Sequence, residues 1–267
     1  MELAREFFGS NFPIIGKERL DNIISGLKNL PDTLTQGTGI RSNTTVFAIK
    51  YENGVVVAGD RRMADGWYGI MSDSVVKVHQ ISNFSAIACA GYCNVISFLE
   101  ENMTSICMAF QERYGRELSI DGQANYLKSL LEGWWFTFLA YRYWDIGVPV
   151  LAAFDQIPDR PRIFSFDADG FYFESEFTAG TGCGWNSVKN VIADRRCEVK
   201  TNDDAIELAV RAMIHSGISS HGVSDVRTVL PKVATIDVEG FKWISEEIIA
   251  GKRDKLFSEN GGLSWLK

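Results

Sequence analysis

The hydrophobic residues near the start of the chain recur with a helical period. A stripe of leucine and isoleucine falls within residues 17–30, at Leu20, Ile23, Ile24, Leu27 and Leu30. This spacing predicts an amphipathic helix, which Pro31 ends before the polar stretch TLTQGTGIRSN. A segment this short cannot form a core of its own. We therefore expect either a surface helix docked on the following domain or a removable leader.

From residue 44 onward the apolar residues come in runs of strand length. The runs TTVFAIKY (44–51) and GVVVAG (54–59) meet at Asn53-Gly54, a dipeptide that favours a tight hairpin. Further strands are predicted at residues 75–80, 84–89, 149–154, 162–166, 171–176, 232–238 and 241–244. Helices are predicted at residues 93–114, 121–144, 185–194, 203–216 and from Ser245 onward.

The order of these elements indicates the fold class. Blocks of strands alternate with pairs of helices, which is typical of antiparallel sheets with segregated helices, an α+β arrangement. The strand runs are nearly continuous in apolar residues, whereas a sheet with one wet face alternates. We therefore expect a four-layer α-β-β-α sandwich of two antiparallel sheets.

Composition narrows the possible functions. The chain has 267 residues, 46% of them hydrophobic, and a net charge of −7, which argues against nucleic acid or an anionic membrane as partner. Five cysteines show no zinc-ribbon spacing, and reduced thiols indicate a cytoplasmic protein. His215 and His221 lie six residues apart without a third ligand, so we predict no metal and no cofactor.

The candidate chemistry begins at Thr44. If the chain is cut before this residue, Thr44 gains a free α-amine, whose pKa near ~8 lets it act as a base at neutral pH. A threonine hydroxyl beside its own amine is a known arrangement for an activated nucleophile. The competing interpretation is an ordinary strand threonine, because threonine favours strands.

The surrounding motif decides between these interpretations. The phrase TTVFAIKYENGVVVAGDRR, followed by VVKV at 75–78 and SAIACAGY at 85–92, resembles the β-type subunit of the 20S proteasome, a bacterial one by its long leader. That family consists of N-terminal-nucleophile hydrolases with an α-β-β-α sandwich. The resemblance implies a propeptide at 1–43, a catalytic domain at 44–267, and autocatalytic cleavage between Asn43 and Thr44.

The resemblance also assigns catalytic roles. Thr44 matches the nucleophile, and Asp60 and Lys77 match the family's acid and lysine, whose positive charge would depress the pKa of the nucleophile. Lys77 is preferred over Val76, which lies at the ungapped position, because the loop at 65–69 can absorb one inserted residue. The competing interpretation of the Asp60–Lys77 pair is a surface salt bridge of little energetic value.

Two further positions match the family around the nucleophile. Gly91 corresponds to the residue whose backbone N–H faces the oxyanion, although a glycine at a strand-to-helix turn is an alternative explanation. Thr181, in Gly180-Thr181-Gly182, corresponds to a serine that lies beside the nucleophile, so the hydroxyl is retained.

The same alignment predicts the pocket for the substrate residue before the scissile bond, the P1 residue. Its wall would comprise four apolar or soft residues, Met63, Val75, Cys89 and Cys93. This wall predicts a preference for apolar or neutral P1 side chains. Plain core packing is the competing interpretation for each of the four.

The chain departs from the family pattern at two places. Asn43 stands where the family most often has glycine, although asparagine tolerates positive φ better than most residues. In the stretch 217–222, Ile218 replaces the family's aspartate and His221 its serine. Asp225, in the following loop, is a candidate substitute for the missing acid.

Three functions remain as alternatives. The first is a threonine peptidase in stacked rings of β subunits, which the resemblance implies would pair with α-type subunits and an ATPase that unfolds protein substrates. The second is a simpler two-ring bacterial peptidase without an α ring, which the long leader opposes. The third is an inactive structural ring subunit, which Asn43 and Ile218 favour and the retained Thr44, Asp60 and Lys77 oppose.

Overall fold

The structure is a computed structural model that describes residues 41–42, 44–65, 69–141 and 148–259. Contacts divide the chain into two compact units. The larger unit comprises Gly39–Trp135 and Asp145–Lys267, and it holds both sheets. The smaller unit comprises Met1–Thr38 and Phe136–Trp144, of which the structure describes only residues 136–141, the end of one helix.

The smaller sheet has five strands in the order β11-β2-β3-β12-β13. Its strands are β2 (Thr45–Tyr51), β3 (Gly54–Gly59), β11 (Thr178–Gly182), β12 (Lys232–Asp237) and β13 (Gly240–Trp243). All its pairings are antiparallel. Strands β2 and β3 form the predicted hairpin, with Tyr51 opposite Gly54.

The larger sheet has eight strands, seven of them in the order β10-β9-β8-β7-β1-β4-β5. These strands are β1 (Arg41–Ser42), β4 (Met63–Asp65), β5 (Gly69–Ser72), β7 (Ser85–Tyr92), β8 (Val148–Asp155), β9 (Arg160–Phe166) and β10 (Tyr172–Ser175). The eighth strand, β6 (Val78–Ser82), pairs with β7. The pairing of β1 with β4 is parallel, and the others are antiparallel.

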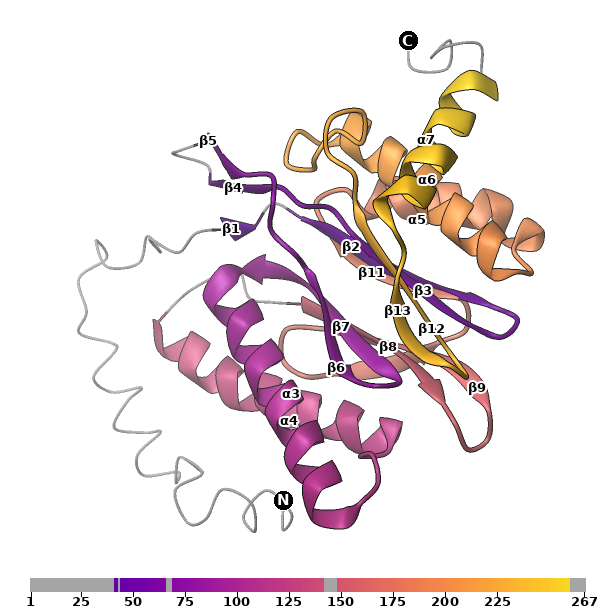
Figure 1. The fold of residues 1–267 in the computed structure, drawn as a ribbon. Coiled ribbons are helices and arrows are strands. Elements are labelled where there is room, and N and C mark those ends of the chain that lie inside the picture. The colour runs from indigo at the N-terminus through magenta and orange to yellow at the C-terminus, as the bar shows by residue number, and fades with distance from the viewer. Residues whose placement is uncertain (1–40, 43, 66–68, 142–147, 260–267) are drawn as a thin grey trace. The chain divides into compact units, whose positions relative to one another are not determined.

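Helices cover the outer faces of both sheets (Figure 1). The helices beside the larger sheet are α3 (Cys93–Tyr114) and α4 (Ile120–Tyr141). Those beside the smaller sheet are α5 (Trp185–Arg195), α6 (Asn202–Ser219) and α7 (Glu246–Glu259), with a 3-10 turn, η3 (Arg196–Glu198), after α5. Thr201 and Asp204 form a capping box at the start of α6, which satisfies two backbone donors that would otherwise lack partners.

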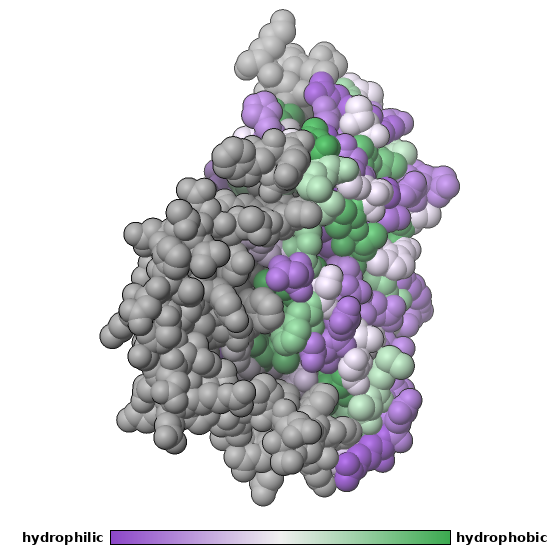
Figure 2. All heavy atoms as spheres, turned by 90° about the vertical axis from the view of Figure 1, so that its left-hand side faces the viewer, coloured by the Kyte–Doolittle hydropathy of each residue, from purple (hydrophilic) through white to green (hydrophobic). Residues whose placement is uncertain are grey.

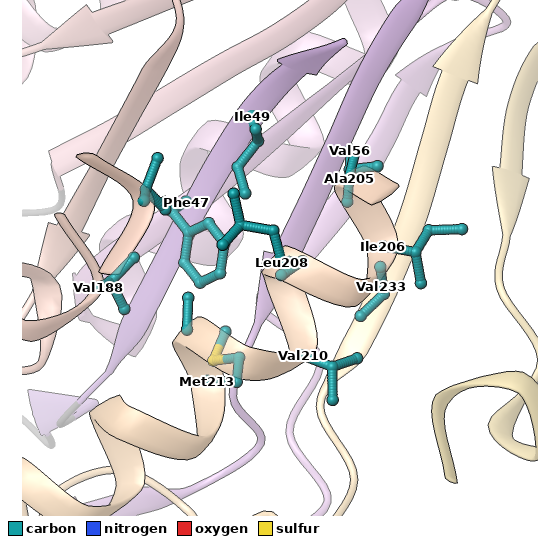
Figure 3. Close-up of a cluster of buried hydrophobic side chains, with 14 of the residues drawn as sticks. Phe47, Ile49, Val56, Val188, Ala205, Ile206, Leu208, Val210, Met213 and Val233 are labelled. Carbon is teal, nitrogen blue, oxygen red and sulfur yellow. The ribbon is translucent and has the colours of Figure 1, made fainter. Parts of the chain in front are cut away.

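Alternate residues of β2 and β3 enter two different hydrophobic cores. Phe47, Ile49 and Val56 pack against α5 and α6, in the cluster that Figure 3 shows. Val46 and Val57 face the other way and pack against residues of the larger sheet. Both faces of these strands are therefore buried, which confirms the α-β-β-α sandwich and explains their continuous apolar runs.

Four strands were not predicted: β1, β4, β5 and β11. The strand predicted at residues 75–80 instead begins at Val78, so Lys77 lies in the segment before it. The predicted helix 93–114 agrees with α3 at both ends, and the other predicted helices agree within a few residues, except that residues 142–144 lie outside the described part. Within the described ranges, no helix is long and apolar enough to cross a membrane.

Candidate active site

Thr44 lies between β1 and β2, where a strand of the larger sheet passes into a strand of the smaller one. Thr44 is 1% exposed, and Thr45 is 0% exposed. The amide of Cys183, which follows β11, donates to the carbonyl of Thr44 at 2.8 Å. The position of Thr44 is therefore fixed from the β11 side as well as by Thr45, the first residue of β2. Asn43, the other residue of the predicted cleavage site, lies outside the described residues.

Asp60, directly after β3, and Lys77, directly before β6, form a buried ion pair. Lys77 Nζ lies 2.9 Å from Asp60 Oδ1, and the two side chains are 0% and 1% exposed. Lys77 also donates to the carbonyl of Arg62. The pair is therefore no surface salt bridge. Val76, the alternative to Lys77, is exposed.

The carboxylate of Asp60 also accepts backbone amides from three segments. The N–H of Thr45 donates to Oδ1 at 2.8 Å, that of Arg62 donates to Oδ2 at 2.9 Å, and that of Ser224 donates to Oδ2 at 3.4 Å. Burial lowers the pKa of Lys77, and the charge of Asp60 opposes this effect. Because Asp60 accepts the amide of Thr45, the ion pair lies directly beside the residue that follows Thr44.

Gly91 lies in β7, two residues before α3 begins, with φ of 137°, a conformation that favours glycine. It pairs with Ser42 of β1, and Ser42 also pairs with Ala64 of β4. The two residues of β1 thus form a strand between β7 and β4. This register brings residues 41–42, the described part of the predicted propeptide, alongside the residue predicted to provide the oxyanion N–H.

Thr181 pairs with Val46 within the smaller sheet and is half-buried. Cys183, in the same segment, contacts Thr44, since its Sγ lies 3.5 Å from the carbonyl oxygen of Thr44. Ser220 Oγ donates to Cys183 Sγ at 3.1 Å. The sequence did not reveal the Cys183–Ser220 contact, because a thiol and a serine separated by 37 residues form no local motif.

The segment that lacks the family's aspartate still reaches the site. Ile218 is exposed. Asp225, the candidate substitute, pairs with Arg227, and that hydrogen bond lowers its pKa. Its neighbour Ser224 contacts the site through two hydrogen bonds. The amide of Ser224 donates to Asp60, and its Oγ accepts the amide of Arg61 at 3.3 Å.

Two of the four predicted pocket residues contact each other. Cys93 Sγ lies 3.5 Å from Met63 Sδ, and both residues are half-buried. Burial raises the pKa of the Cys93 thiol, and Lys77 opposes that shift. Val75 is half-buried and donates its amide to the carbonyl of Arg61. Cys89 is fully buried within β7, and burial raises its pKa.

All five cysteines are free thiols, and the described residues contain no cluster of three or more His, Cys, Asp or Glu side chains suited to a metal.

Comparison with known proteins identifies the family. Residues 40–225 match the model of the family described as "Proteasome subunit". The chain belongs to the proteasome subunit family. Its α-β-β-α sandwich is that of the family, and the resemblance to bacterial β-type subunits expected from the sequence is confirmed by the relatives of this proteasome subunit.

Those relatives include several proteins named "Proteasome subunit beta". The one from Jonesia denitrificans is 28% identical over 251 residues, which cover 93% of this chain and 82% of the relative. The one from Frankia alni is 27% identical over 238 residues, with 87% and 84% covered. The one from Streptomyces griseus subsp. griseus is 28% identical over 242 residues, with 89% and 84% covered.

Proposed function

We propose that this proteasome subunit is the precursor of a threonine peptidase, with residues 1–43 as its propeptide and Thr44 as its nucleophile. One observation carries the proposal: strand β1 lies between Gly91 and Ala64. Arg41 and Ser42 therefore enter the site as an extended strand that ends two residues before Thr44. The buried ion pair of Asp60 and Lys77 lies beside the start of β2, on the other side of Thr44, because Asp60 accepts the amide of Thr45.

Self-cleavage would proceed through an ester. The hydroxyl oxygen of Thr44 attacks the carbonyl carbon of Asn43, the C–N bond between the two residues breaks, and the nitrogen takes up a proton. Water then hydrolyses the resulting ester, which restores the hydroxyl and leaves a carboxylate on Asn43. The product carries a free amine on Thr44, the group that activates the nucleophile in this class of enzyme.

Hydrolysis of a separate substrate peptide would use the same nucleophile and the same chemistry. The free amine accepts the proton of the Thr44 hydroxyl, and the oxygen attacks a substrate carbonyl. The substrate C–N bond then breaks, the leaving nitrogen takes the proton from the Thr44 amine, and water hydrolyses the resulting acyl-enzyme ester to restore the hydroxyl. The charge of Lys77 favours the ionised nucleophile, and the amide of Gly91 stabilises the oxyanion. Met63 and Cys93 would line the P1 pocket, which favours apolar or neutral residues.

The surface supports assembly with other subunits. Exposed hydrophobic side chains lie on edge strands of both sheets, at Ile70 of β5, Phe173 of β10 and Trp243 of β13. Green hydrophobic areas also interrupt the purple surface of the coloured residues in Figure 2. Exposed apolar edges are typical of interfaces. We infer β rings that join α-type subunits and an ATPase in the cytoplasm, with unfolded proteins as substrates.

The proposal is tested by expressing the full chain beside Thr44→Ala and Thr44→Ser. The wild type should lose residues 1–43 by intact mass and hydrolyse a fluorogenic peptide with an apolar P1 residue. Thr44→Ala should keep its leader and show no turnover, whereas Thr44→Ser keeps a hydroxyl and should retain part of both activities. A wild type that keeps its leader and matches Thr44→Ala in turnover would show an inactive structural subunit.

Mass photometry separates the two peptidase assemblies. The wild type is measured alone and with a candidate α-type subunit. Four-ring particles that form only with the α-type subunit support the proposal. Closed, active two-ring particles that form alone, and do not change when the α-type subunit is added, would instead indicate the simpler bacterial peptidase.

A further inference from the structure

The residue after the proposed nucleophile, Thr45, is held by four hydrogen bonds from three other segments. The hydroxyl of Thr45 accepts the amide of Gly184 at 3.0 Å and the hydroxyl of Ser216 at 2.9 Å. Its amide donates to Asp60 at 2.8 Å, and its carbonyl accepts the amide of Asp60 at 3.1 Å. Thr45 and Ser216 are both 0% exposed, so no water competes for these bonds.

Two consecutive amides hold two consecutive residues. The N–H of Cys183 donates to the carbonyl of Thr44 at 2.8 Å, and the N–H of Gly184 donates to the hydroxyl of Thr45. Gly184 immediately precedes α5, and Ser216 lies near the end of α6. The start of β2 is therefore hydrogen-bonded to the residue before α5 and to α6, two of the helices that cover the smaller sheet.

The spacing around this contact leaves no room for larger side chains. A Cβ at position 184 would come within 1.9 Å of Ser216 Oγ and 2.5 Å of Thr45 Oγ1. A Cβ at position 182 would come within 1.9 Å of the carbonyl oxygen of Thr44. Glycine at both positions is what lets the 182–184 turn press against Thr44 and Thr45.

We propose that Thr45 and Ser216 are positioning residues for the reaction of Thr44; this inference rests on the proposed peptidase function. Neither side chain need touch substrate. In the precursor, Thr44 is held on its amino side by β1 and on its carbonyl side by Cys183 and Thr45. Once the leader is removed, the constraint on the amino side is lost, and the contacts on the carbonyl side gain weight in fixing the direction of the amine and hydroxyl of Thr44. The Thr45–Ser216 bond therefore matters more for peptide turnover than for self-cleavage.

The test uses the full chain and four variants. Ser216→Ala and Thr45→Val remove one hydroxyl each with little change in shape, and Thr45→Ser restores the hydroxyl at position 45. Ser85→Ala is the matched control, because Ser85 is equally buried and its hydroxyl also bonds a hydroxyl, that of Ser82 at 2.8 Å, at the start of β7. Leader removal, thermal stability, kcat and KM are measured for each variant. Amide exchange is measured for the peptide that spans residues 182–186.

Ser216→Ala and Thr45→Val should lose their leaders but show kcat lower by roughly ten- to hundredfold, the effect of a misplaced nucleophile. Their KM should stay near wild type, because substrate binding is untouched. Thr45→Ser should recover most of the kcat lost in Thr45→Val, and Ser85→Ala should match wild type. Exchange at Gly184 should be faster in Thr45→Val than in wild type.

Other outcomes overturn specific statements. Processed variants with wild-type kcat would overturn this inference and leave the proposed peptidase intact. The inference would also be overturned if kcat falls in proportion to thermal stability, and to the same extent, in Ser216→Ala and in Ser85→Ala. A wild type without leader removal or turnover would overturn the peptidase itself, and the positioning role with it.

Discussion

Lys77 and Asp60 approach within 2.9 Å at a point where neither side chain is more than 1% exposed. The two partners differ in what else holds them. Asp60 accepts three backbone amides besides the ammonium of Lys77. Lys77 also donates to the carbonyl of Arg62, but a carbonyl supplies no full negative charge, and burial already lowers the pKa of Lys77. The energetic consequence of removing one partner should therefore depend on which one is removed.

We predict that Asp60→Asn destabilises the fold by about 3–5 kcal/mol, because it leaves a buried ammonium without its counter-charge. Lys77→Met should cost only about 1–3 kcal/mol, since the carboxylate keeps its amide donors. Urea denaturation in a Thr44→Ala background keeps all variants in the precursor form. The reverse order of stabilities would contradict the assigned hydrogen bonds. Both substitutions should abolish turnover when Thr44 is present.

Gly182 should not tolerate a side chain. Its φ is 104°, and a Cβ would approach within 1.9 Å of the carbonyl of Thr44. We expect Gly182→Ala to destabilise by at least about 1–3 kcal/mol, the cost of a strained backbone, and to block leader removal. Gly251→Ala, in α7 with no atom within 4 Å of the added Cβ, should instead stabilise by about 0.5–1 kcal/mol. Thermal denaturation of the two variants measures the contrast.

Arg162 should be the main ionic contributor to the edge of the larger sheet. It is 6% exposed and bonds Asp121 at 2.9 Å, Asp155 at 3.2 Å and Glu174 at 2.8 Å. Arg162→Met should cost about 2–3 kcal/mol, less than for a fully buried pair because the acids are partly solvated. Arg160→Met, at a half-exposed position with one contact to Glu174, should cost under about 1 kcal/mol.

The effect of Arg162→Met should depend on pH. The hydrogen bond from Arg162 lowers the pKa of Asp121, so its contribution is present above the carboxylate's ordinary pKa, near ~3.9. It is lost as pH falls through the lowered, folded-state pKa. The stability difference between wild type and Arg162→Met should therefore shrink below about pH 4. A constant difference down to about pH 2 would contradict the ion pairs.

His215 should make the fold less stable in mild acid. Burial lowers its pKa, and the positive charges of Arg211 and Arg195 add to that shift. Below the ordinary histidine pKa, near ~6.5, the unfolded chain binds a proton that the folded chain resists, so stability falls as pH falls through this window. His215→Gln should lose less stability between about pH 8 and 5.5. His221→Gln, at an exposed position, serves as the control and should follow wild type.

The sequence predicted best those elements that carry their own signals. Helix α3 has a helical apolar stripe and ends at Gly115, whose φ is 65°. The β2–β3 hairpin has Asn-Gly at its turn. In contrast, β1 consists only of Arg41 and Ser42, and its strand conformation is set by its neighbours β7 and β4. Strand β11 includes two glycines that disfavour strands, and its pairing with β2 overrides that preference.

The candidate site divides in the same way. Thr44, Asp60 and Lys77 were predicted because their spacing matches a family motif. Cys183, Ser216 and Ser220 were not predicted, because each reaches the site from a segment more than 130 residues beyond Thr44. Short hydroxyl and thiol side chains carry no periodic signal, and only the fold shows that Cys183 contacts Thr44, Ser216 contacts Thr45 and Ser220 contacts Cys183.

Strand β1 would also determine what the larger sheet becomes if the proposed leader is removed. Within the described residues, β4 is hydrogen-bonded only to β1 and β5, so β1 alone connects the β4–β5 hairpin to β7. Removal of β1 would leave two sheet edges facing each other, about one strand apart, with free backbone amides and carbonyls. Such edges accept any extended chain through its backbone, whatever its side chains. The opening left by the leader would thus make the enzyme tolerant of sequence and demanding of unfolded substrates.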